Sequence, residues 1–303
     1  MKSIYKYIVC VCTALAATSC DFLDVVPDNV ATEEHAFADR YTVEKYLASC
    51  YWRVPKAASM SENPGIHGAM EMILNTEYSG DTGMKLGLGQ DSPTSALMNY
   101  WASSYSLYAG IRDCNTFMMG IGDVKDLDEY EKKRMIAEVK MLKAYFHFYL
   151  LSYYGPICLL RESPAVNEST QAVRVYREKV DDCFSYVLDL MDEVIESEAL
   201  PLILSNPTTE LGRFTQPAAY MLKAKILLYW ASPLFNGNTD YNSFRDHNGE
   251  PFFNQTYDAS RWTTAAEACK KAVDICETAG IRLYRTSDYI SAKKLSDQTL
   301  QVQ

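Results

Sequence analysis

The side chains that could carry out a reaction are spread through this sequence without the spacing of a catalytic motif. The four histidines are His35, His67, His147 and His247, and no two of them share one face of a predicted helix. The sequence contains no glycine-rich phosphate loop and no G-x-S-x-G, H-E-x-x-H or C-x-x-C motif. The acidic pair at residues 181–182 lies in a helical segment with polar faces, which favours solvent-exposed surface. The sequence therefore predicts a protein that is not an enzyme and that needs no cofactor.

One segment, residues 236–249, is rich in oxygen atoms that could bind a cation. Its side chains with such atoms include Asn236, Asn238, Asp240, Asp246 and Asn248. They lack the complete spacing of a calcium-binding loop. A turn-rich loop is the favoured interpretation, with a structural Ca²⁺ as the alternative. No other metal site is predicted.

Aromatic residues are the second group of chemically informative side chains, and tyrosine dominates them, with 22 Tyr against 11 Phe and 4 Trp. Tyrosine has an apolar ring and a polar tip, so an excess suits helix packing near water or a wet binding surface. Binding side chains concentrate on loops, which points to two long irregular segments, 54–92 and 233–260. The candidate ligand-binding residues there are Tyr78, Asp81, Lys85, Gln90, Asp91, Tyr241, Phe252, Phe253 and Tyr257. By contrast, Trp101, Trp230 and Trp262 recur among apolar residues at helical spacing and are predicted to lie in the core.

The first twenty residues read as an export signal. Lys2 and Lys6 precede an apolar run at residues 8–17, which is too short to span a bilayer. Small residues then lead to Cys20, as in a bacterial lipoprotein signal, in which the cysteine is acylated and becomes the new N-terminus. We therefore expect residues 1–19 to be a signal peptide and residues 20–31 to be a lipidated tether that attaches the protein to a membrane surface. Ordinary secretory cleavage is the alternative.

The charge of the chain excludes one class of partner. The formal charge is −10, and cleavage would leave 27 basic against 39 acidic side chains, a charge of −12. Nucleic-acid binding needs clustered basic residues, so no nucleic-acid partner is expected. Six cysteines follow the tether, without the tight spacing of a disulfide framework. They are predicted to be buried free thiols and are Cys50, Cys114, Cys158, Cys183, Cys269 and Cys276.

The pattern of apolar residues is helical through nearly all of the remaining chain, which predicts an all-α protein. Short strands are conceivable only near residues 157–160 and 281–284. One predicted helix opens with Ser92 as N-cap and Pro93 at its first position, and another ends where Gly155 follows Tyr154. The predicted helices span residues 32–53, 92–120, 126–154, 173–197, 215–232 and 260–280.

Small residues recur where neighbouring helices must approach, and bulky aromatic residues alternate with them. This alternation is typical of tetratricopeptide-like helix hairpins, in which a large side chain fits opposite an alanine. The 34-residue signature does not recur at a fixed period. We therefore predict a degenerate helical-repeat scaffold with segments 54–92 and 233–260 as long irregular insertions.

Four stretches of the sequence resemble one family, the SusD/RagB nutrient-uptake outer-membrane lipoproteins of Bacteroidetes. The first, Cys20–Pro27, begins with the cysteine expected to carry the lipid. The others are Ala137–Gly155, with an A-E-x-x-x-L-K-A-Y pattern, Gly212–Leu222, with a G-R-x-T pattern, and Pro233–Ala266, which begins P-L-F-N-G. They occur in the family's order along nearly the whole mature chain. Pro156 departs from the pattern, because the family more often has its proline slightly later.

The resemblance implies a tetratricopeptide-like scaffold at the cell surface, held to the outer membrane by a lipid anchor. Such proteins cap the barrel of a TonB-dependent transporter and capture oligosaccharides for import. Aromatic faces and a few amide and carboxylate groups suit sugar binding without catalysis. Two alternatives stay open, a member of the same architecture that captures peptides and a helical-repeat adaptor that binds only protein.

The resemblance also bears on the domain organisation. Family members are considerably longer, so residues 32–303 are expected to be the N-terminal portion of a SusD-like helical domain, with the C-terminal lobe missing. Arg213, which lies in the G-R-x-T stretch, is a candidate for a structural hydrogen-bonding role near a helix start rather than for ligand binding.

Overall fold

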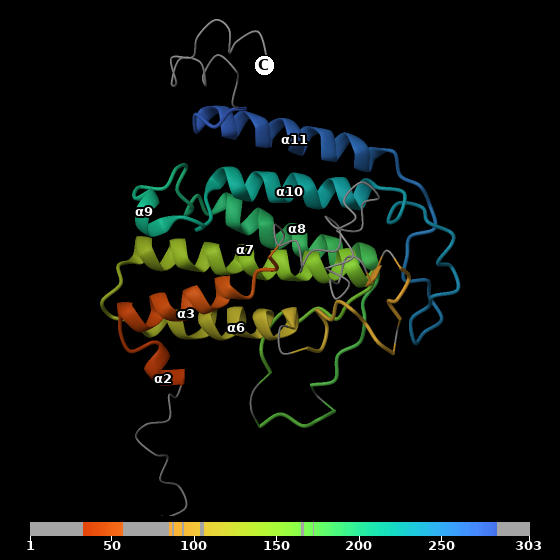
Figure 1. Ribbon diagram of the computed structural model, residues 1–303, viewed down its shortest axis with the longest axis horizontal. Coiled ribbons are helices and arrows are strands. Elements are labelled where there is room, and N and C mark those ends of the chain that lie inside the picture. The colour runs from red at the N-terminus through yellow and green to blue at the C-terminus, as the bar shows by residue number, and fades with distance from the viewer. Residues whose placement is uncertain are drawn as a thin grey trace, which may run out of the picture.

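The fold is a stack of α-helices that run side by side, seen here in a computed structural model (Figure 1). The structure describes residues 33–56, 85–86, 88–92, 94–103, 106–164, 167–171 and 173–283. The helices are α2 (Glu33–Ala36), α3 (Arg40–Trp52), α6 (Leu107–Gly120), α7 (Glu129–Tyr154), α8 (Val180–Glu196), α9 (Pro207–Glu210), α10 (Gln216–Ala231) and α11 (Ser260–Thr278), with a 3₁₀ turn, η4 (Ile121–Asp123), after α6.

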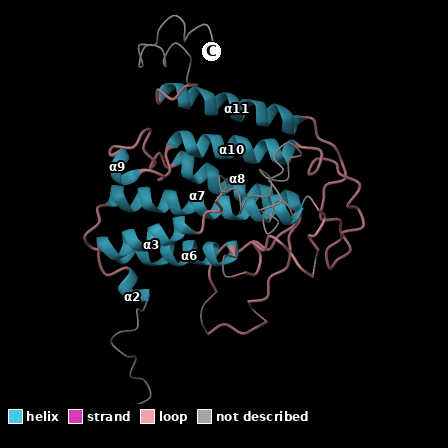
Figure 2. Cartoon of the chain, viewed as in Figure 1, coloured by secondary structure: helices cyan, strands magenta, loops and turns pink. Residues whose placement is uncertain are grey.

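The all-α prediction is confirmed. Within the described ranges the chain forms helices joined by loops and has no strand, only two isolated bridges (Figure 2). The conceivable strand at residues 157–160 is therefore wrong, although the segment is extended. None of the helices in the described part of the chain is long and apolar enough to cross a membrane.

Local signals set the limits of α7, the longest of the described helices. The Asp128 carboxylate accepts from the Glu131 N–H, and the Glu131 carboxylate accepts from the Asp128 N–H, which closes a capping box. The helix ends at Gly155, whose φ of 68° favours glycine. The predicted helices at 126–154, 215–232 and 260–280 are confirmed within three residues at each end.

The predicted helix at 92–120 is wrong in its first half. It begins only at Leu107, with Ser106 as its N-cap. In the segment before it, the Asp91 carboxylate accepts from the Leu97 N–H and the Asn99 side-chain oxygen accepts from the N–H groups of residues 101 and 102. Such side-chain acceptors give the backbone an alternative to helical hydrogen bonds.

Two other predicted helices begin later than expected. The segment predicted at 32–53 is interrupted before Arg40, because Asp39 is extended and caps α3. The helix predicted at 173–197 begins at Val180. Residues before it run extended beside the chain that follows α7, where the Glu178 N–H donates to the Ile157 carbonyl at 2.9 Å.

The core lies between these helices and depends on small residues where aromatic rings must fit. Ala137, Ala144 and Ala219 are buried in it, as the alternation of small and large residues predicts. An added Cβ at Gly110 would lie 2.9 Å from the ring of Phe146, so this position accepts no larger residue without a shift. The fold is thus the tetratricopeptide-like scaffold expected from the sequence.

Some residues predicted to be buried are exposed. Trp262 is 41% exposed on α11. Cys269 is exposed, while Cys158 and Cys276 are half-buried, so the prediction of buried thiols holds only for Cys50, Cys114 and Cys183. All six are free thiols. In the described chain α11 packs on α10, so the outer part of its apolar stripe meets no neighbouring helix.

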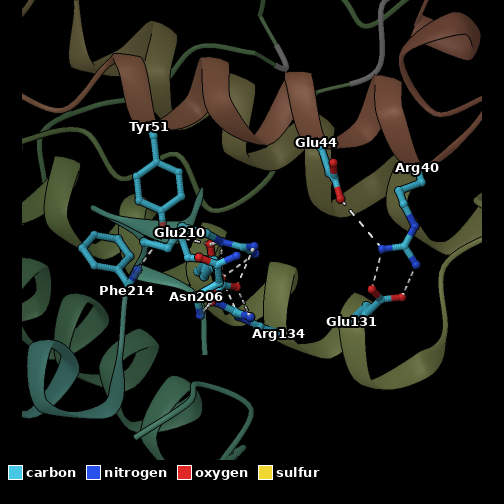
Figure 3. A network of polar contacts seen from close by, with 10 residues as sticks. Arg40, Glu44, Tyr51, Glu131, Arg134, Asn206, Glu210 and Phe214 are labelled. Atoms are coloured by element: carbon cyan, nitrogen blue, oxygen red, sulfur yellow. Dashed lines mark hydrogen bonds and ion pairs between the residues drawn. The ribbon is translucent and has the colours of Figure 1, made fainter. Parts of the chain in front are cut away.

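One buried carboxylate joins three separate parts of the chain. Glu138 on α7 is 0% exposed. Its carboxylate accepts from Arg213 at 2.8 Å, from Arg134 at 3.1 Å and from the Tyr51 hydroxyl at 2.9 Å. Burial raises the pKa of Tyr51, so this hydroxyl stays protonated and donates. The Tyr51 oxygen also accepts a hydrogen bond from the Phe214 N–H. Nearby, Arg134 forms an ion pair with Glu210 (Figure 3). Arg213 therefore has the structural role expected of it.

A second buried pair on α7 holds the extended chain that follows this helix. Lys143 donates to the Arg161 carbonyl. His147 donates from Nδ1 to the Lys143 carbonyl at 2.8 Å and accepts at Nε2 from the Leu160 N–H at 3.3 Å, which requires the neutral ring. Complete burial lowers the pKa of His147 to about 3. The histidine is thus packed and serves as a neutral hydrogen-bonding bridge.

Replacement of the central carboxylate should destabilise the fold strongly. We expect Glu138→Ala to lower the free energy of unfolding by about 3–5 kcal/mol, because it leaves two guanidinium groups without their buried partner. The matched control is Glu193→Ala, which breaks the exposed pair with Lys140 and should cost at most about 1 kcal/mol. Urea unfolding measures both, and equal costs would contradict the structural role of Glu138.

The buried histidine should make stability depend on acid. As pH falls below 6.5 the unfolded His147 binds a proton, whereas the folded ring does so only near pH 3. The contribution of His147 to the free energy of unfolding is complete above pH 6.5. It is lost as pH falls, at up to about 1.4 kcal/mol per pH unit. His147→Gln should lose stability at neutral pH and show a flatter pH dependence than the unsubstituted protein. The exposed His247→Gln is the control, and a His147→Gln profile as steep as that of the control would refute the claim.

Candidate ligand-binding site

The loops of the protein gather at one end of the helical stack, here called the loop end. At this end α7 and α10 finish and α6, α8 and α11 begin (Figure 1). The described segments at the loop end are residues 94–103, 155–164, 167–171, 173–179 and 233–259. Helices α7 and α8 flank the stretch between residues 155 and 179, and α10 and α11 flank residues 233–259, so side chains on these loops can be held in defined positions.

Arg177 ties the three segments of the loop end together. Its guanidinium donates to the Pro156 carbonyl at 3.0 Å. The same group lies 4.6 Å from the ring centre of Trp101 and 5.9 Å from that of Phe244, which are cation–π distances. Trp101 in turn packs edge-on against Tyr154, the last residue of α7. The loop end is therefore one connected surface.

Paired amide and backbone bonds close the long loop at 233–259. The Asn236 amide donates to the Asp258 carbonyl, and the Asn236 side-chain oxygen accepts from the Asp258 N–H, both at 2.8 Å. Gly237 has φ of 78°, and a Cβ there would lie 2.6 Å from the Tyr257 nitrogen. This close approach explains why asparagine and glycine stand in the P-L-F-N-G stretch.

A partly buried ion pair fixes the start of α11 below the same loop. Arg261 donates to both carboxylate oxygens of Asp181, at 2.7 and 3.0 Å, and also to the Phe235 carbonyl. The Trp230 ring nitrogen donates to Asp181 at 2.8 Å. Both ends of the loop are thus anchored to α8, and Trp230 lies half-buried against the core.

Some exposed aromatic rings at the loop end are backed by another ring. Tyr241 is 45% exposed and stacks on Phe253, with ring centres 4.9 Å apart. Tyr176 is 55% exposed and stacks on His247 at 5.1 Å. Tyr257, at the close of the loop, is exposed as well. A ring held from behind presents its free face to solvent with little freedom left to lose on binding.

A hollow of about 430 Å³ lies beside Tyr176 and His247. Charged and polar groups line it, among them Arg161, Lys179 and Asp246. The Arg161 guanidinium is paired with Glu178 through two bonds, at 2.6 and 2.8 Å. An aromatic pair next to fixed hydrogen-bonding groups is an arrangement that can bind a flat, hydroxyl-rich ligand.

The structure places the predicted binding residues in different environments. Gln90 and Asp91 are exposed on the first insertion, and Tyr241 and Tyr257 are exposed on the second. Phe252 and Phe253 are buried and pack beneath Phe244 and Tyr241, so their rings support the surface from within. Tyr78 and Asp81 lie outside the described residues. Lys85 is half-buried. A binding role for each of the nine stays a prediction.

Three residues of the loop end were missed from the sequence, namely Tyr176, Arg177 and His247. Tyr176 and Arg177 lie in residues 173–179, which the sequence pattern assigns to a helix. They were therefore not predicted to be binding residues of a loop. Trp101 was predicted to be core and is half-buried, with Tyr108 and Arg177 on its ring. These residues could have been found from the sequence by a search for aromatic residues next to basic ones in the segments between helices.

The oxygen-rich part of the long loop uses its side chains internally. The Asp246 carboxylate accepts from the N–H groups of Asn248 and Glu250, and the Asn238 oxygen accepts from the Asp240 N–H. Within the described ranges no group of three histidine, cysteine or carboxylate side chains is placed to hold a metal ion. These contacts give the segment a turn-rich structure, and the alternative of a structural Ca²⁺ stays a prediction.

A larger cavity, of about 930 Å³, lies at the other end of the stack between α3, α7 and residues 205–213. Its charged side chains bind one another: Arg40 makes two bonds of 2.5 Å to Glu131, and Arg134 lies 2.7 Å from Glu210 (Figure 3). One guanidinium nitrogen of Arg134 is buried without a hydrogen-bond partner, whereas the other charged groups named here are paired. Because most of its charge is already paired, the cavity favours a structural role over ligand binding.

Comparison with known families and structures identifies the fold. Residues 21–228 match the model of a SusD-like family described as starch-binding and associating with the outer membrane. The solved structure of BT4246 is 26% identical, with a TM-score of 0.71, and the match covers 86% of this chain and 43% of that one. No curated protein sequence matches.

Two further structures share the fold. A SusD-like protein from Bacteroides fragilis is 20% identical with a TM-score of 0.56, and the match covers 82% of this chain and 40% of that one. Surface glycan-binding protein A from Bacteroides uniformis is 20% identical with a TM-score of 0.53, covering 80% and 46%. The chain thus spans less than half of the length of each structure. Because the family model matches more than half of its residues, the chain belongs to the SusD-like family.

Proposed function

We propose that this protein binds oligosaccharides at its loop end and does not transform them. The observation that carries the proposal is the set of exposed rings backed by other rings, Tyr241 on Phe253 and Tyr176 on His247. Sugars present C–H faces to aromatic rings and hydroxyl groups to polar side chains, and the loop end offers both. Two proteins of the same fold are named as glycan binders, a laminarin-binding SusD-like protein and surface glycan-binding protein A.

The binding site would work at the surface of the outer membrane, next to a transporter. In this proposal Cys20 is acylated after removal of residues 1–19, and residues 20–31 form the tether. A fully extended chain of thirteen residues, from Cys20 to the start of α2, reaches at most about 45 Å. That reach keeps the body close to the membrane, where it can pass oligosaccharides to a TonB-dependent barrel of the kind implied by the family resemblance.

Removal of the exposed rings should weaken glycan binding without unfolding the protein. We expect Tyr241→Ala and Tyr176→Ala each to lower the affinity for the bound polysaccharide about five- to thirtyfold, since a stacked aromatic contact contributes about 1–2 kcal/mol. Affinity electrophoresis through gels that contain starch, laminarin or other polysaccharides measures the effect.

The matched control for these variants is Tyr130→Ala, because Tyr130 is 61% exposed and lies at the other end of the stack. Its migration should equal that of the unsubstituted protein. If no polysaccharide slows the migration of the protein, the glycan-binding proposal is wrong, and capture of peptides or binding of protein alone is favoured instead. If Tyr130→Ala weakens binding as much as the loop-end variants, the site is misplaced.

The lipid anchor makes a separate prediction. Cells that express the full chain with labelled palmitate should incorporate label into the protein, and Cys20→Ala should abolish the incorporation because its side chain has no thiol to acylate. Cys276→Ala, at a half-buried cysteine of α11, is the control and should be labelled normally. Equal labelling of Cys20→Ala and the unsubstituted protein would refute the anchor.

A further inference from the structure

Helices α3 and α6 run antiparallel and approach each other closely. A Cβ on Gly110 would lie 3.2 Å from the Cβ of Arg53, which leaves no room for a larger residue between the helices. As the residue numbers rise along α6, the numbers of the partner residues on α3 and at its two ends fall. The contacts, in order, are Gly110 with Arg53, Asp113 with Arg53, Phe117 with Tyr46 and Gly120 with Phe37.

This register brings two cysteines face to face. Cys114 lies four residues after Gly110, and Cys50 lies three residues before Arg53, so each is one turn further along the same seam. Both are 0% exposed. The pairs Gly110–Arg53 and Phe117–Tyr46 lie on either side of the two cysteines, so Cys50 and Cys114 stand opposite each other in the seam. The Cys50 thiol is also among the neighbours that raise the pKa of Cys114. Two cysteines that face each other across closely packed helices are the starting geometry for a cross-link.

We propose that Cys50 and Cys114 form a redox pair that can be oxidised to a disulfide joining α3 to α6. In this reaction two S–H bonds break and one S–S bond forms. The two electrons and two protons pass to a second disulfide, such as that of a thioredoxin-fold oxidase or of oxidised glutathione, which becomes two thiols. The supply of such an oxidant in the cell depends on the export expected from residues 1–19, whereas the reaction with glutathione does not.

Cys183 is the third buried cysteine, and its thiol lies against the carbonyl oxygens of Ile157 and Glu178. Cys158, next to Ile157, is only half-buried. Cys269 and Cys276 lie about two turns apart on α11, roughly 10 Å along the helix, which exceeds the reach of a disulfide. Among the buried cysteines the cross-link is therefore expected between Cys50 and Cys114.

Burial determines when the bond can form. Removal from water raises the pKa of the Cys114 thiol, so little of the reactive thiolate is present in the folded protein. The packed seam also keeps a bulky oxidant away. Oxidation should therefore be slow in the folded state and fast during refolding, when both thiols are accessible.

Peptide mapping tests the proposal directly. The full chain is refolded in oxidised glutathione, its remaining thiols are blocked and the protein is digested with trypsin. Cleavage after Lys45, Arg53, Arg112 and Lys125 releases residues 46–53 and 113–125, each with one cysteine. We expect these two peptides to be joined, with a mass two hydrogens below the sum of the free peptides.

Variants separate this bond from accidental oxidation. Cys50→Ala and Cys114→Ala should each abolish the joined peptide, whereas Cys183→Ala, at an equally buried position, should retain it. The oxidised protein should also unfold about 5–10 °C above the reduced protein, a shift that both single variants lose.

Peptide mapping of the unsubstituted protein decides the proposal even if a variant does not fold. Failure to recover the joined peptide after oxidative refolding would overturn it. Recovery of Cys50 or Cys114 joined mainly to other cysteines would overturn it as well.

Discussion

The buried carboxylate of Glu138 is the interaction on which the arrangement of the helices depends. An ionised carboxylate away from water is unstable unless several donors surround it, and here the donors come from Arg134, Arg213 and Tyr51. They belong to α7 itself, to the turn before α10 and to α3, whose positions are therefore fixed together. This explains physically why the A-E pattern of one sequence stretch and the G-R pattern of another occur in the same chain, because the glutamate of the first binds the arginine of the second.

How far the sequence predicts this fold depends on where the decisive contacts lie. The limits of α7 follow from neighbours in sequence, the capping box at Asp128 and the glycine at 155, so they could be predicted. The start of α6 could not be predicted from the sequence. Ser92 followed by proline is as good a signal for a helix start as Ser106, and only the structure shows the turn at Asn99 that separates them. The extended chain before α8 is held by Ile157, a partner that no local pattern reveals.

The candidate site was predictable as a region and not residue by residue. The long loop at 233–259 could be recognised from its turn residues, and Tyr241 and Tyr257 are exposed there. Phe252 and Phe253 are also aromatic and belong to the same loop, yet they are buried. The exposure of a loop side chain depends on what it packs against, which the sequence does not show. Tyr176 was missed because a helical pattern was assigned to an extended segment that the loop end holds in place.

Stacking on a sugar requires that a ring be fixed before the ligand arrives, since each side chain ordered on binding costs affinity. The loops at the loop end have no regular structure to supply that order. It comes instead from individual contacts: the paired bonds of Asn236 and Asp258, the guanidinium of Arg177 between three segments, and Phe253 beneath Tyr241. In the proposed function, affinity for the glycan therefore also depends on residues that never touch it, because the buried rings of the loop hold the exposed ones in place.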